Sequence, residues 1–416
     1  MTASPGRVFN PRALMTLGLS GVLLLALSAR TGVATLAPLA GDIDLDITLD
    51  GLYLGLLGMI PPVAYGIASW LTKPLARRMS LESLAVTVAA IAAVGHVLRG
   101  VGPNYLGLFM ATVVLMLAVG VTNVLLPALV KLYAPGHIGQ VTSVYSLLMA
   151  ISTAIPALLV VSFADELGWR WALASWAIVS AVAIIPWLFL LPHARARHGA
   201  ERTALLNGGA SPAVASLWSS QTARWLAILF SVSGLTSYSM FAVLPQILME
   251  TASSSREQAA FAVFLWAMMG VPLSIVTPLL AVRPRWPQRL VLVGGVVGVA
   301  GFVGLLLAPG TLTYLWVVLM GFSGMGFSLV LTLVGARTEN HHTAAQLSGL
   351  VNTVGYGIAA TGPIAAGLLA VLTGQWWPTI VLLGLVTSIT AFAYPVLRRG
   401  TTVDEEMRAL FAHLSK

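Results

Sequence analysis

The feature that most constrains this chain is a series of twelve long apolar runs separated by short polar segments. A helix that crosses a membrane needs about 20 mainly apolar residues, and most of the runs approach or exceed that length. The first run is too long for the core of a signal peptide, so we interpret it as a retained span. The sequence therefore predicts an all-α membrane protein with twelve transmembrane helices, at 13–40, 52–71, 84–98, 106–132, 141–163, 171–191, 225–248, 259–282, 290–307, 312–333, 347–372 and 377–397.

The composition agrees with this prediction and excludes several kinds of site. Only 9% of the residues are charged, whereas a soluble domain carries about 25%. The chain has no cysteine, which excludes disulfides, thiolate metal sites and cysteine nucleophiles. It also has no nucleophile elbow, metal-ligand cluster or nucleotide-binding loop. We therefore expect neither an enzyme nor a bound metal or cofactor.

The charged residues predict which way the spans run. With the N-terminus placed in the cytoplasm, 18 of the 22 Lys and Arg residues fall in cytoplasmic segments. The acidic loop that begins at Asp42 falls on the opposite side. This is the positive-inside bias of membrane proteins, so the net charge of +8 reflects topology and contact with anionic lipid rather than nucleic-acid binding. We expect a multi-pass protein of the bacterial inner membrane with both termini in the cytoplasm. The four remaining basic residues are Arg30, Arg99, Arg170 and Arg256.

The two halves of the chain repeat one another at a spacing of about 207 residues, the kind of internal repeat found in transporters. Pro38 aligns with Pro245, and Gln140 aligns with Gln346. A parallel repeat of six spans is typical of major-facilitator transporters, whose halves are related by an axis along the membrane normal. The predicted organisation is a six-helix half at 1–191, a cytoplasmic linker at 192–222, a second six-helix half at 223–398 and a cytoplasmic tail at 399–416.

Four short segments resemble one branch of the major facilitator superfamily, the bacterial cyanate permeases and 2-nitroimidazole transporters. The most specific is GVTNVLLPALVK at 120–131. It is accompanied by TSVYS at 142–146, GWRWALA at 168–174 and LSGLVNTVGY at 347–356. The resemblance implies the major-facilitator fold, transport of a small solute, and an arginine in the first span. The superfamily's loop between spans 2 and 3 is degenerate here and lacks its aspartate, so its gating salt bridge is not expected.

Arg30 is the one charge predicted to lie deep in the membrane, since all 14 acidic residues fall in loops, tails or span edges. An arginine at a helix centre costs about 2.5–3.5 kcal/mol on insertion scales, so it needs a partner or a wet cavity. With no carboxylate inside a span, the partner can be the substrate, because a guanidinium suits a small anion such as a carboxylate or cyanate. The alternative is a structural arginine satisfied by helix-end carbonyls and water.

Further polar and aromatic side chains within spans are candidates for substrate binding. They can donate hydrogen bonds to an anion or stack on a polar ring, but they can equally hydrogen-bond between helices, and a tryptophan can be an interfacial anchor. His96 and Arg99, near the outer end of span 3, are expected to snorkel or to contact loops. The candidate substrate-binding residues are Arg30, Asn123, Tyr145, Tyr238, Trp266, Asn352 and Tyr356.

The function favoured by these residues is secondary active or facilitated transport of a small anionic or polar organic solute by alternating access, with Arg30 as the substrate anchor. Two alternatives remain open: an exporter of neutral aromatic, nitroimidazole-type compounds, and a non-transporting membrane sensor. The expected partners are the solute and the lipid bilayer, and we expect a monomer.

Overall fold

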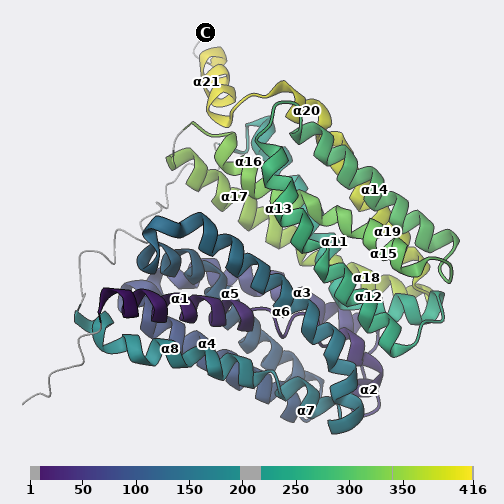
Figure 1. Cartoon of the computed structure of the whole chain (residues 1–416). Coiled ribbons are helices and arrows are strands. Elements are labelled where there is room, and N and C mark those ends of the chain that lie inside the picture. Colours follow the sequence, from purple (N-terminus) through teal and green to yellow (C-terminus); the bar gives the residue numbers. More distant parts are fainter. Residues whose placement is uncertain (1–9, 197–216, 340, 415–416) are drawn as a thin grey trace, which may run out of the picture.

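A computed structural model describes residues 10–196, 217–339 and 341–414 of the chain, and these residues form helices and the turns between them. Figure 1 shows two groups of helices. We call α1 to α8 the first half and α11 to α21 the second half. The all-α fold with two bundles predicted from the sequence is confirmed. Most of the predicted linker lies outside the described residues.

The first half supplies six spans, of which the first is interrupted. Its elements are α1 (Pro11–Ser28), η1 (Ala37–Leu39), α2 (Ala40–Asp44), α3 (Gly51–Arg78), α4 (Leu81–Val101), α5 (Tyr105–Tyr133), η2 (Pro135–His137), α6 (Ile138–Leu167), α7 (Trp169–Ala174) and α8 (Ala177–Ala196).

The second half also supplies six spans, several of which are divided by a kink into two labelled helices. Its elements are α11 (Gln221–Thr251), α12 (Arg256–Met268), α13 (Gly270–Ala281), α14 (Pro287–Leu307), α15 (Thr313–Gly321), η3 (Phe322–Gly324), α16 (Met325–Ala336), α17 (His341–Ala359), α18 (Thr361–Thr373), α19 (Trp377–Ser388), η4 (Ile389–Ala393), α20 (Tyr394–Arg399) and α21 (Val403–Leu414).

Polar residues in the short loops start the spans where the sequence changes from polar to apolar. The side chains of Asp50, Ser80, Asn104 and Ser220 each accept a hydrogen bond from a backbone N–H in the first turn of the next helix. Such N-caps satisfy donors that have no partner within the helix. The short apolar run at 84–98 thereby becomes α4, which is 21 residues long.

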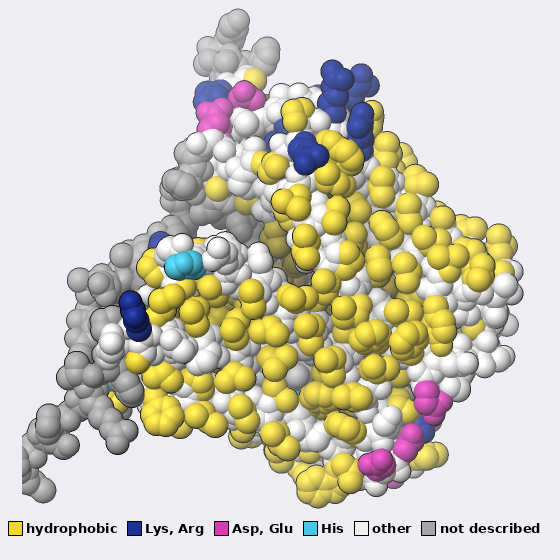
Figure 2. Space-filling model, in the orientation of Figure 1, with side chains coloured by type: hydrophobic (Ala, Val, Ile, Leu, Met, Phe, Trp, Pro, Cys, Tyr) yellow, Lys and Arg dark blue, Asp and Glu magenta, His cyan; other side chains and the backbone are white. Residues whose placement is uncertain are grey.

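Eleven helices of the described chain are long and apolar enough to cross a membrane. The remaining span begins with a shorter apolar helix, at Arg12–Ser28. Figure 2 shows a largely apolar face, with Lys and Arg gathered near α20, and Asp and Glu both at the opposite end and beside α21. The protein is therefore a multi-pass membrane protein whose two ends differ in charge.

The two halves meet at one end of the molecule, which we call the closed end, around α2, α12 and α18 (Figure 1). There α18 packs on α3, and α12 packs on α6. A Cβ added to Gly367 would lie 1.9 Å from the carbonyl oxygen of Gly51, and one on Gly55 would lie 2.4 Å from that of Pro363. Glycine is therefore required for the close contact between α3 and α18. The halves diverge towards the other end, which carries α21 and which we call the terminal end.

The tail helix α21 docks on the terminal end of the second half through Glu406. This carboxylate accepts hydrogen bonds from the hydroxyls of Ser220 (2.6 Å), Thr222 (2.6 Å) and Thr401 (3.0 Å) and from the backbone N–H of Thr222. Burial alone would raise the pKa of the Glu406 carboxyl, but these hydrogen bonds hold its pKa below the usual value. A lowered pKa means that the carboxylate contributes stability above the usual carboxyl pKa and loses it as the pH falls through the lowered value. The tail is therefore docked at neutral pH.

Replacing this carboxylate is expected to release α21. Glu406→Gln weakens the charge-assisted hydrogen bonds by about 1.5 kcal/mol. The ratio of undocked to docked α21 should therefore rise roughly tenfold. Because the chain has no cysteine, a single Cys at Met407, which is partly buried against the second half, reports the opening by its rate of maleimide labelling. The control is Glu405→Gln, since exposed Glu405 accepts a hydrogen bond only within its own turn. Equal labelling rates in the two variants would contradict this role of Glu406.

Candidate functional site

Span 1 is interrupted in the middle, and Arg30 lies in the interruption. The helix α1 ends at Ser28, residues 29–36 form turns and bends, and helix resumes only with η1 and α2. The expectation of a continuous helix over 13–40 is wrong at this point. The hydroxyls of Ser28 and Thr31 hydrogen-bond to main-chain carbonyls three residues earlier, at 2.9 and 3.1 Å. These local bonds compete with the regular helical pattern, and Gly32 adds flexibility to the backbone.

Arg30 lines a cavity of about 350 Å³ between the two halves. Ser146, Met149 and Thr153 of α6 line it from the first half. The second half contributes residues of α11, α12, α13, α15, η3 and α16, and the described lining residues include no carboxylate. Because α13 and α16 form the parts of their spans nearest the terminal end, the cavity extends from Arg30 towards that end. The lining residues of the second half that carry polar or aromatic side chains are Ser237, Tyr238, Phe241, Trp266, Ser274, Phe327 and Ser328.

The Arg30 side chain has no hydrogen bond or ion pair with any residue that the structure describes, and its Nε is buried. Three tyrosines surround it closely enough to interact electrostatically: Tyr65, Tyr238 and Tyr356. The ring centroids of Tyr65 and Tyr238 are 6.3 Å apart, and those of Tyr65 and Tyr356 are 6.1 Å apart, both with edge-to-face geometry. Arg30 is thus an unpaired cation placed beside three phenols from both halves, which we call the tyrosine cluster.

The other predicted site residues divide into three groups by position. Tyr238 and Trp266 line the cavity. Tyr356 belongs to the tyrosine cluster, and the buried side chain of Asn123 interacts with Tyr65 of that cluster. Tyr145 and Asn352 are not among the described residues that line the cavity in this conformation.

Helix geometry accounts for these two placements. Tyr145 packs against the core of the first half, whereas its neighbour Ser146 faces the cavity. Adjacent residues point about 100° apart on a helix, so one of the two must turn away. The Asn352 amide donates instead to the hydroxyl of Ser348 at 3.3 Å, one turn earlier on α17.

Sequence reasoning missed Tyr65 of α3, which lies at the centre of the tyrosine cluster. It is only 2% exposed, and its hydroxyl has no hydrogen-bond partner in the described chain. The available signal is a tyrosine in the middle of an apolar run. The same signal had marked Tyr238 and Tyr356. Phe241 of α11 was also missed, because a phenylalanine in an apolar span carries no distinguishing signal.

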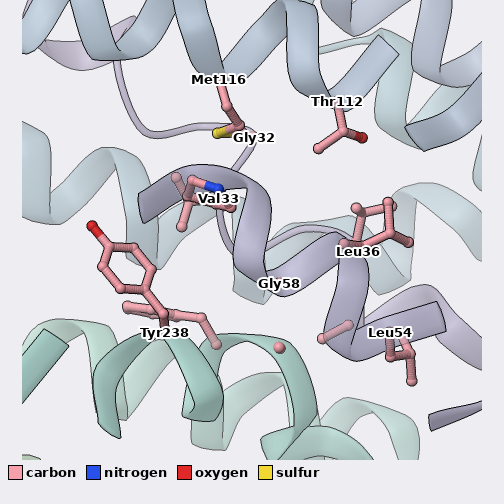
Figure 3. A pocket seen from close by; sticks show the side chains of 13 residues that line it. Gly32, Val33, Leu36, Leu54, Gly58, Thr112, Met116 and Tyr238 are labelled. Atoms are coloured by element: carbon pink, nitrogen blue, oxygen red, sulfur yellow. The ribbon is translucent and has the colours of Figure 1, made fainter. Parts of the chain in front are cut away.

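A second, much smaller cavity of about 30 Å³ lies on the other side of Tyr238 and Phe241. Figure 3 shows Gly32 and Val33 of the interrupted stretch, Met116 of α5 and Tyr238 around it. A cavity of this size has room for little more than one water molecule. Because Tyr238 and Phe241 line both cavities, these two side chains separate the large cavity from the closed end.

Arg256 at the start of α12 links the two halves at the closed end. Its guanidinium forms an ion pair with Asp42 of α2 and a second with Asp165 of α6, at 3.3 Å. Nearby, the Gln246 side chain of α11 donates to the backbone carbonyl of Ala37 at 2.8 Å. These contacts hold the closed end together in addition to the packing of α3 on α18.

Removing the arginine is expected to loosen the closed end. Arg256→Ala removes the two partly exposed ion pairs, which together stabilise the closed end by about 1 kcal/mol. Their loss should raise the ratio of open to closed molecules roughly fivefold. Spin labels at Leu45→Cys and Thr311→Cys, both in exposed loops at this end, measure the separation of the halves. Longer distances are expected in Arg256→Ala but not in Arg283→Ala, which removes an exposed arginine elsewhere. Unchanged distances in Arg256→Ala would show that the ion pairs do not hold this end closed.

Comparison with known proteins agrees with this arrangement. The model of the family described as Major Facilitator Superfamily matches residues 22–363. The chain is 29% identical to a 2-nitroimidazole transporter of Escherichia coli (strain K12) over 400 residues, covering 94% of this chain and 96% of the relative. It is 22% identical to the cyanate transport protein CynX of the same strain, covering 85% and 90%.

A solved structure of a bacterial homologue of the human lysosomal transporter Spinster, in an inward-facing and unoccupied conformation, has the same fold. It superposes with a TM-score of 0.74 at 16% identity, covering 94% of this chain and 98% of that one. The family match spans most of the chain, and the relatives are those of the cyanate and 2-nitroimidazole branch. The chain belongs to the major facilitator superfamily and is a transporter of the cyanate permease and 2-nitroimidazole transporter type.

Proposed function

We propose that this protein moves a small anionic or polar organic solute across the bacterial inner membrane by alternating access, with Arg30 as the substrate anchor. The observation that carries the proposal is an unpaired arginine on the wall of a cavity whose described lining includes no carboxylate. In a medium of low dielectric constant an unpaired charge is costly. A small anion that enters the cavity supplies the missing partner and can accept two parallel hydrogen bonds from the guanidinium.

The chemistry of the cavity favours a small solute with a polar or planar group. Hydroxyls of Ser146, Thr153 and Ser237 lie on its wall beside the rings of Tyr238 and Trp266. Hydroxyls can donate hydrogen bonds to an anion, and aromatic rings pack on planar groups. The cyanate transport protein among the relatives supports a small anion as the substrate.

The asymmetry between the two ends supports the proposal of alternating access. The closed end is held by the contact of Gly367 with Gly51 and by the ion pairs of Arg256, while the cavity extends towards the terminal end. We propose that the terminal end faces the cytoplasm, because Lys and Arg gather there (Figure 2). The described conformation is then inward-facing, and a rocking motion of the halves about the cavity would expose Arg30 to the other side.

A second candidate is the export of neutral aromatic compounds of the nitroimidazole type. The tyrosine cluster and Trp266 favour it, because they offer aromatic surface next to hydrogen-bond donors. The 2-nitroimidazole transporter among the relatives also supports it. In this case Arg30 would donate to a nitro or carbonyl oxygen rather than pair with a charge.

Counterflow in proteoliposomes tests transport itself. Vesicles that contain the purified protein and a high internal concentration of one unlabelled compound are diluted into the labelled compound. We expect transient accumulation of label for at least one of cyanate, nitrate, bicarbonate, short carboxylates and 2-nitroimidazole, compared with protein-free vesicles. Accumulation of 2-nitroimidazole alone would favour the second candidate. No accumulation with any of these compounds would contradict both and favour a membrane protein that does not transport, such as a sensor.

A further inference from the structure

A second arginine, Arg99 of α4, is completely buried and does not line the cavity. Its relative exposure is 0%, as is that of His96 one turn earlier on the same helix. The expectation that these two side chains snorkel is wrong, because both are buried away from the surface. No ion pair joins Arg99 to a residue that the structure describes, and its Nε and Nη2 are buried without hydrogen-bond partners there. A charge held in this way needs a structural reason, because burying it is costly.

Arg99 and His96 both bind the interrupted stretch of span 1. The Nη1 of Arg99 donates to the backbone carbonyl of Gly32 at 3.0 Å and lies 3.5 Å from the hydroxyl of Thr35. The Nε2 of His96 is hydrogen-bonded to the hydroxyl of Thr31 at 3.1 Å. A Cβ on Gly32 would lie 3.0 Å from Arg99 Nη1 and 2.6 Å from a methyl group of Leu115. The stretch is therefore pressed against α4 and α5 at a point where only glycine fits.

The interruption creates a need for such a cation. Within the interruption the main chain leaves the regular helical pattern, so a carbonyl such as that of Gly32 needs a donor other than the N–H one turn further along, and inside a membrane each unsatisfied group costs several kcal/mol. Arg99 supplies this donor to the carbonyl of Gly32, which is two residues from Arg30 along the chain.

We propose that Arg99 is a positioning residue for Arg30. Arg99 fixes the carbonyl of Gly32, and His96 fixes the hydroxyl of Thr31 beside it. Together these bonds set the path of the main chain that carries Arg30. The path of the main chain determines where the Arg30 guanidinium lies in the cavity. Arg99 does not touch the solute. This inference rests on the proposed anchor role of Arg30 for its consequence in transport, but the positioning itself can be tested without any substrate.

The substrate-independent test uses the absence of cysteine from the chain. In Arg30→Cys the introduced thiol is the only one, and its rate of reaction with a sulfonate-bearing methanethiosulfonate reports its exposure to the cavity. We expect Arg99→Lys to change this rate by about fivefold or more. This factor corresponds to a change of about 1 kcal/mol in the equilibrium between exposed and shielded positions of the thiol. Lysine keeps the charge but lacks the planar fork of donors. The matched control is Ser237→Cys, on the opposite wall of the same cavity, whose rate should not respond to Arg99→Lys.

The outcomes separate positioning from a general loss of structure. A change at position 30 alone supports the proposal, even if cyanate is not a substrate. Equal changes at positions 30 and 237 would mean that Arg99 acts on the whole fold, and no change at either position would mean that it does not hold the stretch; both results overturn the proposal. If Arg99→Lys fails to fold, Thr31→Val, which removes the hydroxyl's bonds to His96 and to the Ser28 carbonyl and leaves Arg99 unchanged, should give a smaller change confined to position 30. A rate unaltered by Thr31→Val would then overturn the proposal.

A second experiment links positioning to function through a double-mutant cycle. With cyanate as the probe, Arg99→Lys should weaken binding about tenfold when Arg30 is present and have no further effect in Arg30→Gln. A tenfold loss in both backgrounds would overturn the proposal that Arg99 acts through Arg30. Absence of cyanate binding to the wild type would count against the proposed substrate class, whereas the labelling result would still decide the positioning role.

Discussion

In Arg30→Gln, counterflow of a small anion such as cyanate is expected to fall by roughly 100-fold or more. The reason is that Arg30 is the charged residue among the described lining residues of the cavity. Without it, the anion would enter the cavity with no cation to pair with. Removing one member of a desolvated charge pair costs about 2–5 kcal/mol, and 3 kcal/mol corresponds to a factor of more than 100. Glutamine keeps a neutral amide donor but is shorter than arginine, so the loss reports the charge, the fork of donors and the reach of the arginine side chain together.

Two comparisons make this result specific. Arg283→Gln makes the same chemical change at an exposed position away from the cavity, and its anion flux should match that of the wild type. Counterflow of 2-nitroimidazole in Arg30→Gln should fall by less than tenfold, because a neutral compound loses a hydrogen bond rather than an ion pair. Anion flux in Arg30→Gln equal to that of the wild type would refute the anchor role and leave Arg30 as a structural residue.

The variant Gly367→Val is expected to abolish transport by preventing closure of the closed end. The Cβ of the new side chain would lie 1.9 Å from the carbonyl oxygen of Gly51, and neither backbone can yield without separating α18 from α3. Overpacking typically costs about 1–3 kcal/mol and occasionally more, and because the clash is with the backbone we expect a cost of at least about 3 kcal/mol, which raises the ratio of open to closed molecules at this end by more than roughly 100-fold. Spin labels at positions 45 and 311 should report longer distances, and counterflow should fall to that of protein-free vesicles.

The matched control lies within the same span. A Cβ on Gly357 of α17 would meet nothing within 4 Å, so Gly357→Val introduces the same side chain into the span without forcing the halves apart. It should retain the distance distribution and the flux of the wild type. If Gly367→Val behaved like Gly357→Val, the contact between α3 and α18 would not be the closure on which alternating access depends.

Much of the fold could be predicted from the sequence because the bilayer imposes it. Apolar length and charge asymmetry along the chain are local properties, and they located the spans, including α4 with its short apolar run. The special status of Arg30 followed from the same reasoning, since an isolated charge in an apolar run needs a compensating feature. Tyr238 and Trp266, which the sequence suggested as substrate-binding residues, line the cavity, and their role in binding stays a prediction.

What could not be predicted depends on packing between distant segments. Hydropathy does not distinguish a continuous helix from one interrupted after Ser28, because both are equally apolar. The interruption is held by Arg99, whose sequence position near a span end suggested snorkelling. Its bond to Gly32 joins residues that are far apart in the sequence. The orientations of Tyr145 and Asn352 likewise depend on which face of each helix the opposite half covers, and no periodic signal in these nearly uniform spans reveals that face.

The most direct test of the central claim is the thermal stability of the purified wild type and of Arg30→Ala in a panel of small anions, with 2-nitroimidazole alongside. A ligand that binds only the folded protein raises its apparent stability by mass action, about 2.7 kcal/mol at 100 times its Kd. We predict that at least one anion stabilises the wild type and fails to stabilise Arg30→Ala at the same concentration. If no anion stabilises the wild type, or if both proteins respond equally, Arg30 is not the anchor of an anionic substrate.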